Sequence, residues 1–192
     1  MGNLFLYVLT VGIWGTTWIA ITFQLGNVPE SWSVAYRFAL AAIVLHLFCL
    51  ARGFRLRFGL APHLHFLGLG LFLFSANYWL VYLSTDHLAS GLVAVVFSIM
   101  SVFNIFNAML FLGKPLERRA LLSAGLGLTG VTFIFWPEVQ SLSLSDEGAV
   151  GLALALGSAM LASWGNTISA RTSSEGLTVH AMNAWSMTYG AT

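Results

Sequence analysis

Charged residues are scarce in this sequence. Lys, Arg, Asp and Glu make up 8% of its 192 residues, whereas hydrophobic residues make up 58%. A soluble domain is typically about 25% charged, so the composition excludes an ordinary soluble globule. The net charge of +1 gives no sign of a nucleic-acid partner. We therefore predict an all-α integral membrane protein, a multi-spanning helix bundle in the lipid bilayer.

Cysteine and catalytic motifs are also scarce. Cys49 is the single cysteine, which excludes an intramolecular disulfide and a multi-cysteine metal site. The sequence has no H-E-x-x-H, P-loop or G-x-S-x-G pattern. Gly125, Gly127 and Gly130 fit G-x-G-x-x-G, but they lie inside an apolar helical stretch, so we interpret them as helix-packing residues. We predict no catalytic residues and no metal site.

Long apolar runs make up most of the sequence. A helix needs roughly 17 to 25 mostly apolar residues to cross the hydrocarbon core. We predict six such spans, separated by turns that contain glycine or proline, at about residues 4–23, 34–51, 65–83, 88–112, 120–136 and 148–170. Residues 178–192 become apolar again but stop short of a spanning length. We expect a truncated seventh helix and a fragment of a longer protein.

The charges alternate between successive loops. Basic residues fall after the second, fourth and sixth spans, at Arg52, Arg55, Arg57, Lys114, Arg118, Arg119 and Arg171. The charged residues of the other loops are all acidic: Glu30, Asp86, Glu138, Asp146 and Glu147. Because cytoplasmic loops are enriched in Lys and Arg, this pattern predicts a cytoplasmic N-terminus. The one exception is Arg37, which lies inside the second span.

An internal repeat joins the first and sixth spans. Both contain W-G-x-T-x-x-A, at residues 14–20 and 164–170. The first copy runs outward and the second inward, as in an inverted-topology repeat of five helices each. We therefore assign residues 1–140 to a first repeat and 141–192 to the start of a second. Such repeats commonly rock around a midplane site, which favours a transporter that works by alternating access.

Candidate substrate-binding residues lie on four of the predicted spans. The third span places Ser75, Tyr78, Trp79 and Tyr82 on one face, beside Asn77. A cavity wall and an interfacial aromatic belt both fit this face. In the fourth span, Ser98, Ser101 and Asn104 fit ligand contact or helix packing, and Asn104 and Asn107 should point into the bundle. Trp14, Thr17 and Trp164 complete the candidate set.

Two further patterns lie in the second and sixth spans. Arg37 lies about one turn inside the second span, where it either snorkels to the interface or faces the bundle as a charge partner for a substrate carboxylate. Small residues recur at every fourth position of the sixth span, at Gly151, Ala155, Ala159, Ser163 and Thr167. This ridge predicts close packing against another helix.

The chain resembles EamA-type members of the drug/metabolite transporter superfamily. The resemblance rests on residues 14–18, on Arg37-Phe38 with the Ala-rich residues that follow, and on residues 110–113 with Gly125, Gly127 and Gly130. One departure is Lys114, where these proteins usually have Glu. The resemblance implies ten helices in two inverted repeats, a cavity lined partly by helices one, three, four and six, and no cofactor.

These observations together predict an exporter of small metabolites such as amino acids, in a bacterial cytoplasmic (inner) membrane. The direction of transport comes from the resemblance alone. The expected partners are a small-molecule substrate, the bilayer, a C-terminal half of the same protein and a second copy in a homodimer. Two alternatives stay open, a membrane-embedded enzyme and a non-transporting scaffold subunit.

Overall fold

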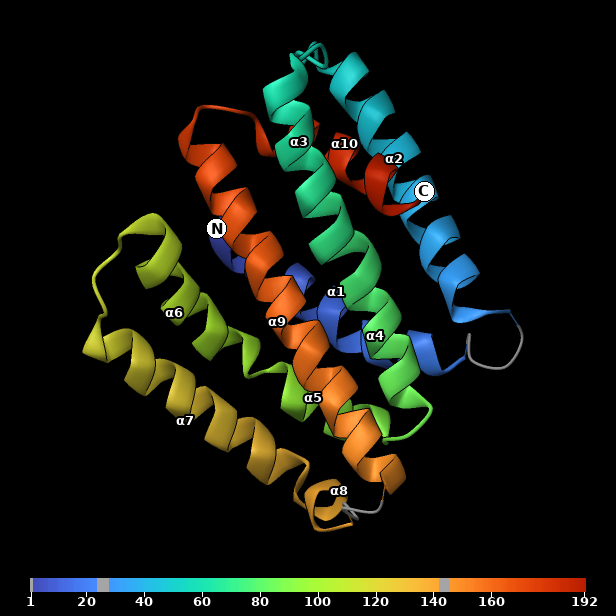
Figure 1. Ribbon diagram of the computed structural model, residues 1–192, viewed down its shortest axis with the longest axis vertical. Helices are drawn as coiled ribbons and strands as arrows, with labels where there is room; N and C mark the ends of the chain where they lie inside the picture. The colour runs from blue at the N-terminus through green and yellow to red at the C-terminus, as the bar shows by residue number, and fades with distance from the viewer. Residues whose placement is uncertain (1, 24–27, 142–145) are drawn as a thin grey trace.

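A computed structural model shows the arrangement of the helices (Figure 1), and it describes residues 2–23, 28–141 and 146–192. The described residues form helices and contain no strand, which confirms the all-α prediction. The elements are α1 (Gly2–Thr22), α2 (Glu30–Ala51), α3 (Leu60–Leu69), the π-helix η1 (Gly70–Ser75), α4 (Ala76–Thr85), α5 (Ser90–Phe97), α6 (Met100–Leu112), α7 (Arg118–Ile134), α8 (Trp136–Gln140), α9 (Asp146–Ser174) and α10 (Val179–Gly190).

Five helical rods in the described part of the chain are long and apolar enough to cross a membrane. They are Leu4–Thr22, Glu30–Ala51, Leu60–Thr85, Ser90–Leu112 and Glu147–Ser174. The third rod joins α3, η1 and α4, and the fourth joins α5 and α6. The predicted span at 120–136 is the 17-residue helix α7, at the short end of the spanning range. The predicted stub at 178–192 is α10.

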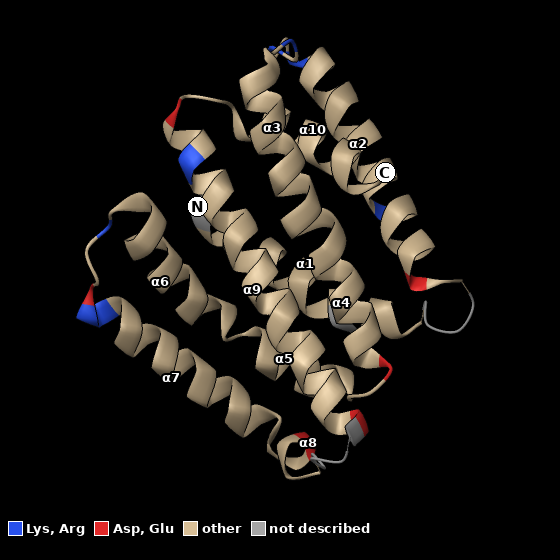
Figure 2. Ribbon diagram, viewed as in Figure 1, with Lys and Arg blue, Asp and Glu red and all other residues tan. Residues whose placement is uncertain are grey.

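Basic residues gather at some turns of the bundle and are absent from the others that the structure describes. Figure 2 shows Lys and Arg at the α2–α3 and α6–α7 turns and at the end of α9. The starts of α2 and α9, the α4–α5 turn and α8 carry acidic residues instead. At the α6–α7 turn, Gly113 ends α6 with a φ of 63°, a conformation that glycine adopts without steric cost.

Helix α9 is the centre of the packing. In Figure 1 it lies between the α3–η1–α4 rod and α6, and it contacts all of these elements. Ala155, Ala159 and Ser163 on α9 are 0% exposed, which confirms the predicted small-residue ridge. The Asn107 amide on α6 donates a 2.7 Å hydrogen bond to the Ser163 hydroxyl. Asn107 therefore points into the bundle, as predicted.

Helix α10 packs against α2, α3 and η1. The helices approach closely at Gly190, where a Cβ atom would lie 2.8 Å from Phe74 Cβ and 3.0 Å from the Gly70 carbonyl oxygen. Two polar contacts join α10 to the region where α3 begins. The Trp185 indole donates to the Leu56 carbonyl at 3.0 Å, and the Tyr189 hydroxyl shares a 2.9 Å hydrogen bond with His63 Nδ1. Helix α10 thus packs onto helices from the first part of the chain.

Candidate functional site

A cavity of about 520 Å³ lies among the helices of the bundle. Side chains from α1, α2, the α3–η1–α4 rod, the α5–α6 rod, α9 and α10 line it. Most of the wall is apolar or aromatic. The polar residues of the wall are Thr17, Arg37, Asn77, Tyr78, Asn166, Ser169 and Asn183. A largely apolar hollow with a few converging polar groups is the usual form of a small-molecule site.

A change of helix type beside the cavity positions one of its walls. The rod that begins as α3 becomes π-helical over Gly70–Ser75 and then returns to α-helix at Ala76. The Ala76 amide donates to the Leu71 carbonyl, five residues back. Single π-helical turns are frequent at functional sites. Here the residues on both sides of this switch, Phe74, Asn77 and Tyr78, line the cavity.

Arg37 faces the bundle. Its guanidinium carbon lies 4.8 Å from the centre of the Tyr78 ring and 5.8 Å from that of the Phe38 ring. Tyr82 interacts electrostatically with the same guanidinium. A cation inside a spanning helix costs up to about 2.5–3.5 kcal/mol by insertion measurements, the value at the helix centre. One cation–π contact stabilises the cation by only about 0.5–2 kcal/mol, which does not fully offset this cost.

Two amides form further polar parts of the site. Asn77 is 3% exposed, and its Nδ2 donates to the Leu73 carbonyl at 3.3 Å, whereas its Oδ1 has no hydrogen-bond partner. Asn166 on α9 donates to Asn104 Oδ1 at 3.4 Å and contacts Met100 Sδ at 3.7 Å. Asn104 therefore points into the bundle, although it supports the cavity wall and does not line it.

The structure places four of the predicted site residues around this cavity: Trp14, Thr17, Tyr78 and the charge partner Arg37. The other seven candidates lie outside its lining. On the third rod, Ser75 is half-buried, Trp79 is 48% exposed and Tyr82 is fully buried. The Ser98 hydroxyl donates to the Val95 carbonyl of its own helix at 2.6 Å, and Ser101 is exposed.

Trp164, the remaining candidate, lies at a second hollow of about 270 Å³. This hollow also contacts Phe72, Phe111, Thr167 and Arg171. The Trp164 and Phe72 rings meet edge to face, 5.7 Å apart. Trp164 and Trp14 occupy matching positions of the internal repeat, but they line different cavities.

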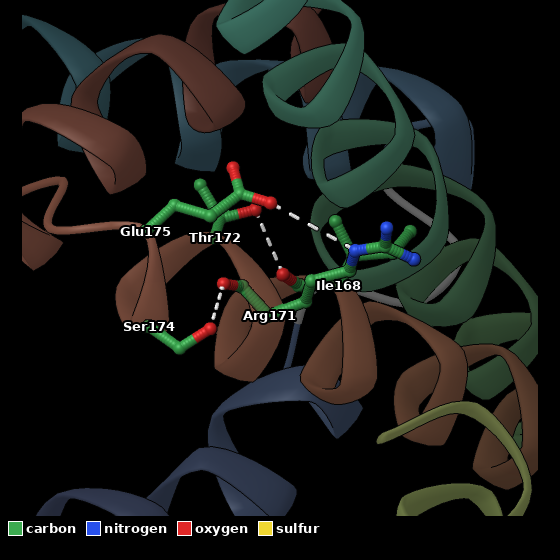
Figure 3. A network of polar contacts seen from close by, with 5 residues as sticks. All are labelled: Ile168, Arg171, Thr172, Ser174 and Glu175. Atoms are coloured by element: carbon green, nitrogen blue, oxygen red, sulfur yellow. Dashed lines mark hydrogen bonds and ion pairs between the residues drawn. The ribbon is translucent and has the colours of Figure 1, made fainter. Parts of the chain in front are cut away.

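Arg171 belongs to a polar network at the end of α9 (Figure 3). Its Nε lies 3.8 Å from Glu175 Oε1, and its carbonyl accepts a 2.6 Å hydrogen bond from the Ser174 hydroxyl. The Thr172 hydroxyl donates to the Ile168 carbonyl at 2.8 Å. Both charged side chains are substantially exposed, so this ion pair adds little stability.

Sequence reasoning did not select three amides that line the cavity, Asn77, Asn166 and Asn183. Asn166 lies inside the repeated W-G-x-T motif, so the motif could have identified it. Asn77 was placed beside the aromatic face, and no sequence signal marks the π-helical turn that precedes it. Within the part of the chain that the structure describes, no group of three His, Cys, Asp or Glu residues could hold a metal ion.

Comparison with known proteins gives a consistent result. The sequence profile of the EamA-like transporter family matches residues 1–136. Protein PagO of Salmonella typhimurium is 26% identical over 152 residues, which cover 79% of this chain and 50% of that protein. An uncharacterized transporter in the trpA 3′ region of Buchnera aphidicola is 27% identical over 157 residues, 80% of this chain and 51% of that protein.

The chain thus spans about half the length of the curated relatives that it matches. No solved structure matches it.

Proposed function

Because this chain belongs to the EamA-like transporter family, we propose that it forms part of a membrane transporter that exports small metabolites, such as amino acids, by alternating access. One observation supports this proposal most directly. A cavity of about 520 Å³, with aromatic and polar walls, lies among apolar helices. Membrane-embedded polar groups of this kind usually mark a substrate path.

The architecture of the whole protein is part of the proposal. A second repeat of inverted topology would begin with α9 and α10 and would supply the rest of the cavity. The alternating loop charges favour a cytoplasmic N-terminus, in a bacterial cytoplasmic membrane. A homodimer is compatible with this arrangement.

The lining residues suggest how a substrate is held. Trp14 and Tyr78 offer aromatic faces, which bind apolar groups and cations. Arg37 offers donors to an acidic group, and Thr17 is a further polar contact. The other candidates, Ser75, Trp79, Tyr82, Ser98, Ser101, Asn104 and Trp164, would act from behind this wall or in another state of the transport cycle.

A pair of tyrosine variants tests this function. In cells that express the protein from its complete reading frame, Tyr78→Ala should reduce efflux of the transported amino acid about 10-fold or more, because it removes a cavity wall and exposes Arg37. Tyr36→Ala is the matched control, since Tyr36 is 65% exposed and lies outside the cavity. Amino-acid release after peptide feeding, and survival on toxic amino-acid analogues, are the measurements.

Two results would contradict the proposal. If deleting the gene changed neither efflux nor analogue resistance, the scaffold alternative would be favoured. If Tyr36→Ala and Tyr78→Ala reduced efflux equally, this cavity would not be the substrate site.

A further inference from the structure

The second hollow, of about 270 Å³, is separate from the proposed substrate cavity. It lies between the ends of α6 and α9, beside Phe72 of η1, and the two hollows share no lining residue. Its wall is apolar or aromatic except for Thr167 and Arg171. The Thr167 hydroxyl donates to the Ser163 carbonyl of its own helix at 2.9 Å. Among the described lining residues, Arg171 is therefore the polar group left for a ligand.

The apolar part of the hollow lies at the outside of the described bundle. Phe111 on α6 is 59% exposed and Trp164 on α9 is 39% exposed, although both helices belong to rods that can cross a membrane. In a bilayer, surfaces at this depth meet acyl chains. Trp164 and Arg171 are seven positions apart, which is about 10 Å along α9. One leaflet supplies roughly 15 Å of hydrocarbon, so the hollow can follow an acyl chain over about two-thirds of that depth.

Arg171 lies at the polar end of the hollow. It is the first charged residue after the apolar run 148–170, and its side chain is 64% exposed. Its ion pair with Glu175 uses Nε at a distance of 3.8 Å, and Figure 3 shows the two terminal nitrogens of the guanidinium pointing away from Glu175. A pair of guanidinium nitrogens can bind a phosphate through two parallel hydrogen bonds. Arg171 thus offers a site for a phosphate group at the mouth of an apolar hollow.

The surrounding charges also favour an anionic group. Leu112, the last residue of α6, lines the hollow together with Arg171, so the basic α6–α7 turn lies beside the end of α9 (Figure 2). The basic residues at this end outnumber the acidic ones, Lys114, Arg118, Arg119 and Arg171 against Glu117 and Glu175. Basic pockets between spanning helices on the cytoplasmic side bind anionic lipid head groups.

We propose that this hollow binds one anionic phospholipid, with an acyl chain along Phe111 and Trp164 and the phosphate on Arg171. An apolar groove alone would accept any lipid, but the cation at its end favours an anionic head group over a zwitterionic one. In the state that the structure describes, Trp164 then contacts lipid. By the predicted orientation, the lipid belongs to the cytoplasmic leaflet. This site concerns a different hollow from the proposed substrate cavity, so it does not depend on the substrate.

Two lipids with identical acyl chains test the head-group preference. Dioleoylphosphatidylglycerol is anionic, and dioleoylphosphatidylcholine is zwitterionic. Native mass spectrometry of the protein from its complete reading frame, in detergent, gives the dissociation constant of the first bound lipid. The wild type should bind phosphatidylglycerol about 5-fold more tightly, which is the usual contribution of one basic residue near a membrane surface. An excess of glycerol 3-phosphate, which carries the phosphate without the chains, should not displace the lipid.

Charge variants test the role of Arg171. Arg171→Gln should remove the preference for phosphatidylglycerol. Arg57→Gln is the matched control and should keep the preference, because Arg57 is an exposed cation at the α2–α3 turn, outside the hollow. Arg171→Lys is a second variant, in case Arg171→Gln does not fold, and it should keep a preference because it keeps the positive charge.

A second pair of variants tests the apolar part of the hollow. Thr167→Phe fills it and should weaken the binding of both lipids about 10-fold, the effect of losing about two buried CH₂ groups. Thr129→Phe is the control. Thr129 is exposed on α7, and its hydroxyl donates to the Gly125 carbonyl at 2.8 Å, the same kind of bond that Thr167 makes.

Four results would overturn the proposal. Equal binding of the two lipids by the wild type is the result expected if another part of the protein, or a second copy, covers the hollow. An Arg171→Gln protein that keeps the preference would exclude Arg171 as the phosphate site. Equal weakening by Thr167→Phe and Thr129→Phe would exclude the hollow as the site of the acyl chain. Displacement of the lipid by glycerol 3-phosphate would indicate a site for a soluble anion.

Discussion

The contact between α9 and the π-helical turn allows a sharp test of the packing. A Cβ atom on Gly165 would lie 2.7 Å from Leu73 Cβ and 3.1 Å from the Leu73 backbone nitrogen. Neither atom is the end of a flexible side chain, so Gly165→Ala forces the helices apart. Gly157, two turns earlier on α9, is the control, since its Cβ would lie 3.4 Å from Leu80 Cδ1, an ordinary contact.

The expected sizes follow from two opposing effects. Replacing glycine by alanine within a helix stabilises it by about 0.8–1.0 kcal/mol. Overpacking a close contact costs about 1–3 kcal/mol. Gly165→Ala should therefore lower the free energy of unfolding by up to about 2 kcal/mol, whereas Gly157→Ala should leave it unchanged or raise it by up to about 1 kcal/mol.

Unfolding in mixed detergent micelles, followed by tryptophan fluorescence, gives these free energies for the protein from its complete reading frame. Each variant adds one methyl group to the same helix, so general effects of the substitution cancel. Equal stability of the two variants would refute the assigned contact between Gly165 and Leu73.

Two further predictions concern the bundle and its orientation. A double-mutant cycle between Asn107→Leu and Ser163→Ala should give a coupling free energy of about 0.6 kcal/mol, and at most about 1.7 kcal/mol, because interhelical hydrogen bonds in membranes are weak. Additive effects of the two substitutions in the same unfolding assay would contradict the 2.7 Å hydrogen bond. Alkaline phosphatase fused to the chain is active only outside the cytoplasm, where its disulfides form. A fusion after Arg57, in a predicted cytoplasmic loop, should therefore be inactive, and a fusion after Asp86, in a predicted outer loop, should be active. The opposite pattern would invert the proposed topology.

The sequence predicted the helices well because the bilayer imposes a strong constraint on length and polarity. Predicted ranges such as 88–112 and 148–170 match Ser90–Leu112 and Asp146–Ser174 closely. The differences fall at the ends, where polar residues such as Glu30 extend a helix past its apolar core. Hydropathy counts only the apolar part, so it cannot locate these first turns.

The residues of the candidate site were harder to predict, because they depend on which face of each helix is turned toward the cavity. The straight-helix pattern groups Ser75 with Tyr78 and Tyr82, but the π-helical turn ends at Ser75 and changes the rotation before Tyr78. Asn77 and Tyr78 then line the cavity, while Ser75 does not. The orientation of Arg37 was open for a similar reason, because only the position of the Tyr78 ring shows that the guanidinium faces inward.

A cation held among spanning helices responds to the membrane potential when it moves through the field. One elementary charge that crosses the full potential changes in energy by about 2.3 kcal/mol per 100 mV. Among the described residues that line the cavity, no acidic group balances Arg37. A bound carboxylate would cancel this charge, so the loaded protein would respond to voltage less than the empty one. In the proposed export cycle, voltage would then act mainly on the return of the empty cavity, a step in which no substrate moves.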